Sequence, residues 1–239
     1  MIRTVPFLCL LVLGALTCSA CSSTIDVGDD EGGGGTPGPG PTGSKRMFVT
    51  RAAYTGDLAV LGEGQAAPGS DRGADGADRL CAAAAQAANL GGSWKAWISS
   101  CTMGPESTCV DVHNAIDRIA DVPGGWYNVN RSAHLFSNKG NLASYPLANA
   151  WTDGAAEPKS NVLDEHGNAL PTNEKDSTQV WTGTGNGGLL AQGTCSGWTA
   201  PETGDTKGTI GLMTPDPSKW TNVTIEECHH PSHLYCLEQ

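Results

Sequence analysis

The sequence predicts a protein of the α+β class, in which short strands, one main helix, one shorter helix and long loops are held together by disulfides. Three observations lead to this prediction: an alanine-rich helical segment, several short apolar runs bounded by turn-forming residues, and an even number of cysteines in the main part of the chain. The chain has 239 residues with 32 glycines and 14 prolines, which favours many turns over long regular elements. With 38% hydrophobic residues it is long and apolar enough to bury a core.

The first 20 residues are typical of a signal peptide. Arg3 precedes an apolar run from Val5 to Leu16, which is too short to cross a bilayer comfortably and is followed by small residues. The sequence LTCSAC at 16–21 resembles a bacterial lipobox, whose final cysteine is acylated and becomes the mature N-terminus. We therefore expect Cys21 to anchor the protein by lipid to the outer membrane or surface of a bacterium. Ordinary cleavage, which would give a secreted or periplasmic protein, is the alternative.

Residues 21–45 are predicted to form a disordered linker behind the lipidated cysteine. The stretch 22–44 is rich in glycine and proline and contains no aromatic residue, one isoleucine and one valine. Such a composition offers too little apolar surface to offset the entropy lost on ordering. The folded domain is expected to cover residues 46–239.

The charge balance excludes several classes of partner. The chain has 25 acidic against 14 basic residues, a formal net charge of -11. A net-negative chain repels nucleic acids and heparin-like polyanions at long range. We expect no nucleic-acid partner and no affinity for heparin-like polyanions.

The clearest helix covers residues 74–90, because alanine, leucine and glutamine favour helix and Gly91 ends it. Its periodicity places Cys81 on a predicted core face with Leu80, Ala84 and Ala88. A shorter helix is expected at 113–120. Strands are expected at 48–51, 94–98, 126–129, 179–182 and 233–237, each bounded by Gly, Pro, Asn or Ser.

The six cysteines that follow the linker predict three disulfides in an exported protein. They are Cys81, Cys101, Cys109, Cys195, Cys228 and Cys236. Six cysteines permit fifteen pairings. Only the short Cys101–Cys109 loop, which contains Gly104 and Pro105, suggests a local bridge. None of these six cysteines belongs to a CxxC motif, so a structural zinc site or a thioredoxin-like site has little support in the predicted domain.

Six motifs follow one another in a characteristic order along the predicted domain. They are GADGADRLC at 73–81, ANLGGSWKAWISS at 88–100, VWTGT at 180–184, CSGW at 195–198, CHH at 228–230 and LYCLE at 234–238. Together they resemble the endostatin domain of collagens, a branch of the C-type-lectin-like superfamily. The resemblance implies two nested bridges, Cys81–Cys236 and Cys195–Cys228, with Cys101–Cys109 as an addition. It also implies core positions for Trp181, Trp198 and Trp220.

The metal sites of this superfamily are not expected here. Calcium-dependent lectins of a similar fold use Glu-Pro-Asn or Gln-Pro-Asp and Trp-Asn-Asp, whereas this chain has Lys159 after Glu157-Pro158, and Asn222 without the aspartate. Mammalian endostatin binds zinc near its amino terminus, where this chain has no histidine before Phe48. His229, His230 and His233 are dense in the sequence, but we expect structural or surface roles for them. No metal and no cofactor is predicted.

The predicted function is a non-enzymatic, calcium-independent binding or interaction module for a protein or glycan. GxSxG is absent, and no Ser, His and Asp set has motif context. The pairs Asp164-Glu165 and Glu226-Glu227 are expected to be solvated. The ligand face, if the loops form one, is expected near Trp151, Glu157, Asn173, Glu174 and Asp176. The alternative is a periplasmic or surface hydrolase of glycans or peptides, which would need two loop carboxylates roughly 5–9 Å apart.

Overall fold

Two apolar segments from opposite ends of the domain, β1 (Lys45–Val49) and β10 (Tyr235–Glu238), pair antiparallel in the middle of a five-stranded sheet. This computed structural model describes residues 42–62, 72–105, 108–144, 162–171, 178–199, 206–213 and 217–239. The strand order is β2-β10-β1-β5-β6, with β2 at Trp94–Ala96, β5 at Trp126–Asn128 and β6 at His134–Phe136. β1 and β5 are parallel, and the other pairs are antiparallel.

Both faces of the central sheet are buried at Met47–Val49 of β1 and at Tyr235–Leu237 of β10, which explains why these two runs are continuously apolar. Met47 and Val49 of β1 join one core cluster, and Phe48 between them joins a second cluster. In β10, Tyr235 and Leu237 belong to the first cluster, and Cys236 belongs to the second. The alternation follows directly from the two-residue repeat of a strand.

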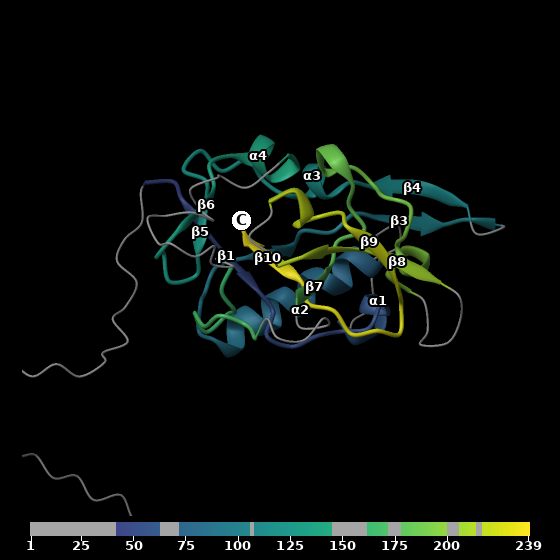
Figure 1. Ribbon diagram of the computed structural model, residues 1–239, viewed down its shortest axis with the longest axis horizontal. Coiled ribbons are helices and arrows are strands. Elements are labelled where there is room, and N and C mark those ends of the chain that lie inside the picture. The colour runs from purple at the N-terminus through teal and green to yellow at the C-terminus, as the bar shows by residue number, and fades with distance from the viewer. Residues whose placement is uncertain are drawn as a thin grey trace, which may run out of the picture. The chain divides into compact units, whose positions relative to one another are not determined.

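The main helix is α2 (Arg72–Ala87), so the predicted helix at 74–90 is confirmed with both ends two to three residues earlier. Its buried side is formed by Ala74, Ala77, Cys81 and Ala85. The predicted core face of this helix was only partly right. Cys81 is buried as expected, but Leu80, Ala84 and Ala88 are only half-buried, so the buried face is rotated about the helix axis from the predicted one. The short helix α1 (Leu58–Leu61) packs against α2 (Figure 1). This approach requires Gly76, since a Cβ there would lie 2.1 Å from the carbonyl oxygen of Leu58.

The second helical prediction was too long. The helix α3 covers Ala115–Arg118, and His113 ends the preceding strand. The Ser99 hydroxyl accepts a hydrogen bond from the Ala115 N–H, which fixes the start of α3. A further short helix, α4, covers Lys139–Ala143.

Two smaller sheets complete the fold. β7 (Gln179–Trp181), β8 (Lys207–Leu212) and β9 (Thr224–Glu227) form an antiparallel sheet with β8 in the middle. β3 (Ser100–Met103) and β4 (Cys109–His113) form a two-stranded hairpin, seen at the right of Figure 1. The five predicted strands overlap β1, β2, β5, β7 and β10, whereas β3, β4, β6, β8 and β9 were not anticipated. The remaining turns are η3 (Asn186–Gly188), α6 (Cys195–Trp198) and η4 (Pro217–Lys219).

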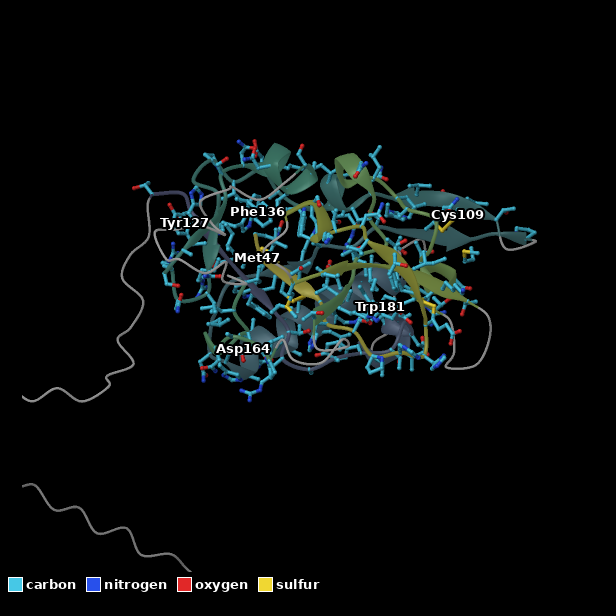
Figure 2. The ribbon with its side chains drawn as sticks, viewed as in Figure 1. Met47, Cys109, Tyr127, Phe136, Asp164 and Trp181 are labelled. Carbon is cyan, nitrogen blue, oxygen red and sulfur yellow. A yellow bond between two sulfur atoms is a disulfide. The ribbon has the colours of Figure 1, made fainter. Side chains whose placement is uncertain are left out.

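Three disulfides tie these elements together, and their pairing is the expected one. Cys81–Cys236 joins α2 to β10 across 155 residues of sequence, and Cys195–Cys228 joins α6 to the turn after β9. Cys101–Cys109 links β3 to β4 diagonally within the hairpin, close to its turn (Figure 2). The structure is thus a mixed α+β fold with more sheet than helix and three disulfides.

The turn α6 is left-handed over four consecutive residues. Cys195, Ser196, Gly197 and Trp198 have φ values of 46°, 56°, 69° and 60°. Left-handed backbone costs roughly 1–2 kcal/mol for each residue other than glycine. The Cys195–Cys228 disulfide and a hydrogen bond from the Trp198 indole N–H to the Ser99 carbonyl (2.8 Å) hold the turn in place.

Candidate functional site

An open groove of about 550 Å³ lies on the β8–β9 side of the molecule and is the best candidate for a ligand site. Strand β8 contributes Thr209, strand β9 contributes Thr224 and Ile225, and the segment before β9 contributes Asn222. The opposite wall comes from the residues on either side of η3, which are Gly185 before it and Leu190, Ala191 and Gln192 after it. The groove is therefore built from three segments that are distant in the sequence.

Backbone hydrogen bonds hold both walls of the groove. The Leu190 N–H donates to the side-chain oxygen of Asn114 (2.9 Å), and the Gly185 N–H donates to the Leu189 carbonyl (2.7 Å). On the other wall, Val223 N–H donates to the Ile210 carbonyl (2.9 Å). These contacts give the groove a defined shape without a bound ligand.

The position of Asn222 is fixed by the buried residue that precedes it, Thr221. Thr221 is 5% exposed and accepts a hydrogen bond from the Trp97 indole N–H (3.0 Å). A Cβ on Gly185 would lie 3.7 Å from Nδ2 of Asn222, so the amide faces this glycine across the groove. The strand register and the core thus fix the position from which Asn222 projects.

The chemistry of the groove is neutral. Its polar side chains are the amides of Asn222 and Gln192 and the hydroxyls of Thr209 and Thr224, and no charged residue lines it. Within the described part of the chain, the two amides form no side-chain hydrogen bond. The larger apolar side chains that line the groove beside them are Ile225, which is 46% exposed, and Leu190, which is half-buried. Such a surface suits an uncharged ligand that offers both hydroxyl or amide groups and apolar faces.

A second hollow of about 510 Å³ lies at the end of α2. It is lined mainly by alanine and glycine, together with Gln86, Asn89 and Trp94. It therefore offers fewer converging polar groups than the β8–β9 groove.

The three tryptophans that the family resemblance places in the core offer no stacking surface for a ligand. Trp181, Trp198 and Trp220 are at most 1% exposed, which confirms the expected core positions; Figure 2 labels Trp181 within the fold. The indole N–H of Trp181 donates to the Tyr54 carbonyl (2.7 Å). The ring of Trp220 packs on Trp97, with ring centroids 5.2 Å apart.

Arginines hold one buried carboxylate, Glu238, and one half-buried carboxylate, Asp78. Glu238 accepts two side-chain hydrogen bonds from Arg46, at 2.8 and 3.0 Å. Burial opposes ionisation of Glu238, but Arg46 outweighs it and holds the pKa of that carboxyl below its ordinary value. Asp78 pairs with Arg118 at 2.8 Å, yet burial dominates there and raises the pKa of Asp78.

The expectation that Asp164 and Glu165 are solvated was wrong. Their exposures are only 1% and 8%. Asp164 Oδ1 accepts from the N–H groups of His166 and Asn168, and Glu165 accepts from the Arg51 N–H (2.7 Å). Short polar side chains commonly stabilise turns in this way, so both carboxylates are structural.

The three histidines of the C-terminal segment separate into two environments. His233 is buried, and its Nδ1 donates to the Thr50 carbonyl (2.7 Å). Burial lowers the pKa of His233, which keeps the ring neutral. His229 and His230 remain near the surface, where Glu227 joins them; one ligand atom from each residue lies within 4.8 Å of the others. This is the group of described residues that could hold a metal ion.

The predicted acylation site and the predicted ligand face lie outside the described residues. This applies to Cys21 and to the loop residues Trp151, Glu157, Asn173, Glu174 and Asp176. Asn222, considered only as a remnant of a calcium motif, is the sequence-derived residue that lines the groove. The other groove residues carry no motif, and only the pairing of β8 with β9 brings them together.

Comparisons with known proteins leave the family open. No known family model matches the chain, and no curated protein matches it significantly. Among the described residues, no helix combines the length and the apolar character needed to cross a membrane.

Proposed function

We propose that this protein is an extracytoplasmic binding module, tethered to a bacterial membrane through a lipid on Cys21, that recognises a glycan or protein without calcium and without catalysis. The observation that carries the proposal is the β8–β9 groove. It presents unpaired amides of Asn222 and Gln192 beside exposed aliphatic side chains, on walls fixed by backbone hydrogen bonds.

The groove chemistry favours an uncharged glycan over other ligands. A side-chain amide can donate to one sugar hydroxyl and accept from another. The aliphatic side chains of Leu190 and Ile225 can cover the apolar face of a sugar ring. An acidic chain with net charge -11 would disfavour polyanionic glycans.

For the fold we propose the endostatin-like branch of the C-type-lectin-like superfamily. Three features support this proposal: the nested Cys81–Cys236 and Cys195–Cys228 bridges, the pairing of the first strand with the last, and a main helix bridged to the last strand. Folds of this kind host many functions, so the function is argued from the groove itself.

A hydrolase has less support than a binding module. Among the described residues, the carboxylates of Asp78, Asp164, Glu165 and Glu238 are shielded from solvent, and each is held by an arginine or by backbone N–H groups. None of them lines the groove.

The test is binding of the purified chain to an array of neutral and acidic glycans, with calcium and again with a chelator. We expect neutral glycans to bind equally well in both conditions. Binding that disappears in chelator would contradict calcium independence. If the protein bound none of the neutral glycans, glycan recognition would be contradicted, and a protein would remain as the proposed ligand.

The tether is tested separately by replacing the proposed acylation site. The wild-type protein expressed in a bacterium should partition into detergent, and Cys21→Ala should remain in the aqueous phase. A wild-type protein that stays aqueous would contradict the lipid anchor.

A further inference from the structure

The end of β9 and the turn that follows it place two carboxylates and two imidazoles within five consecutive residues. Glu226 and Glu227 end β9, and His229 and His230 follow after Cys228. Nδ1 of His229 lies 3.4 Å from Oε2 of Glu227, and Nδ1 of His230 lies 3.3 Å from Oε1 of Glu226. The two rings are nearly perpendicular, with centroids 4.5 Å apart.

We propose that Glu227, His229 and His230 form a binding site for a divalent zinc ion. Zinc prefers imidazole nitrogen and carboxylate oxygen at about 2.0–2.2 Å, which places two ligand atoms of a tetrahedral site roughly 3.3 Å apart. One candidate ligand atom from each of the three residues already lies within 4.8 Å of the others. Closing to the zinc geometry requires shifts of about an ångström, which rotation of surface side chains supplies. This inference does not depend on the proposed function.

The backbone under the proposed site is fixed from both sides. Cys228, which separates the carboxylate from the histidines, is 2% exposed and bonded to Cys195. Its N–H donates to the Thr206 carbonyl (3.1 Å), and its own carbonyl accepts from the Gly56 N–H (2.6 Å). The His230 N–H donates to the Glu227 carbonyl (3.0 Å) and closes the turn. The ligands therefore project from a turn that needs no reordering to bind an ion.

Glu226 serves as a positioning residue for His230. Its side chain is 16% exposed and also accepts from the Gln179 amide (3.5 Å), so it is anchored to β7. A carboxylate on Nδ1 of His230 fixes the tautomer that leaves Nε2 available, an arrangement common around zinc. In the β8–β9 ladder, Lys207 is paired with Glu227. Its single positive charge faces the two negative charges of Glu226 and Glu227, so this local set of three side chains favours a cation.

Three protein ligands leave at least one zinc coordination position for water or another donor. Glu227 and Ile225 lie on the same face of β9, because they are two residues apart in one strand. The proposed ion therefore sits at the end of the strand that lines the groove.

The experiment is isothermal titration of Zn²⁺ into the full chain, purified in detergent without a polyhistidine tag and stripped with a chelator. We expect one zinc per chain with micromolar affinity, weakened at least tenfold in His229→Ala and His230→Ala and weakened in Glu227→Gln. His166→Ala, which removes an exposed histidine elsewhere, should bind as wild type does.

Cobalt gives a second measurement on the same variants. Co²⁺ in a four-coordinate site with nitrogen ligands absorbs visible light, and this band should be lost in His229→Ala and kept in His166→Ala. Equal melting temperatures in chelator would show that the variants are folded. The proposal would be overturned if the wild type bound no zinc. It would also be overturned if each of the three single variants, His229→Ala, His230→Ala and Glu227→Gln, bound zinc as tightly as the wild type.

Discussion

The half of the molecule around β1, β10 and α2 uses its polar side chains differently from the half around β8 and β9. In the first half, Glu238 takes both of its side-chain hydrogen bonds from Arg46, whose guanidinium also lies 5.3 Å from the centre of the Trp94 ring. In the second half, Asn222 and Gln192 line a groove without a side-chain partner among the described residues. The difference indicates where to look for function: polar side chains bonded to one another stabilise the fold, whereas exposed polar side chains without an internal partner are available to a ligand.

We expect the largest loss of stability from removal of the Cys81–Cys236 bridge, which lies in the half of the molecule around β1, β10 and α2. It closes a loop of 155 residues, for which chain entropy gives about 5 kcal/mol of stabilisation. The Cys101–Cys109 bridge spans only 8 residues, for which the same relation gives about 2.5 kcal/mol. Cys81→Ala/Cys236→Ala should therefore lower the free energy of unfolding more than Cys101→Ala/Cys109→Ala, measured by urea denaturation. The reverse order would mean that the hairpin, rather than the central sheet, limits stability.

The next effect comes from the Arg46–Glu238 pair. Both side chains are mostly buried, at 17% and 11% exposure, so breaking the pair leaves an uncompensated charge. We expect Arg46→Met or Glu238→Met alone to cost about 2–3 kcal/mol. The double variant Arg46→Met/Glu238→Met should recover much of that loss, because it removes both charges together. A double variant as unstable as the sum of the two would show that the charges act independently.

A smaller effect is expected from pH, through His233. Burial lowers the pKa of His233 in the folded protein from an ordinary value of 6.5, so the unfolded chain takes up the proton more readily. The protein should lose stability as pH falls below about 6.5, while above that value His233 contributes no pH dependence. His233→Asn, which retains a donor for the Thr50 carbonyl, should remove this loss between pH 6.5 and 5 in thermal melts. If the melting temperatures of the wild type and of His233→Asn changed by the same amount between pH 6.5 and 5, the idea of a neutral, buried His233 would be contradicted.

Much of the central sheet could be predicted from the sequence, because its signals are local. The alanine run of α2 favours helix, and the apolar runs within β1 and β10 favour buried strands, whatever the rest of the chain does. The spacing of the cysteines suggested only one of the three bridges. The other two bridges were predicted from the family resemblance, and the structure has the same pairing.

The β7–β8–β9 sheet was only partly predictable. Strand β8 contains Gly208 and Gly211, which weaken any strand signal. Both glycines are required by packing: a Cβ at Gly208 would lie 2.8 Å from Sγ of Cys195, and one at Gly211 would meet the Trp220 carbonyl oxygen at 1.9 Å. The groove depends on this sheet, so its residues could not be assembled from local patterns.

The most direct test of the account is the affinity of a groove variant for a glycan that the wild type binds. Asn222→Ala removes an exposed amide and should leave the free energy of unfolding within about 0.5 kcal/mol of wild type. Its affinity should fall at least tenfold, whereas the matched control Asn168→Ala, exposed on another part of the surface, should bind as wild type does. Unchanged affinity in both Asn222→Ala and Gln192→Ala, with both proteins folded, would contradict the groove as the binding site.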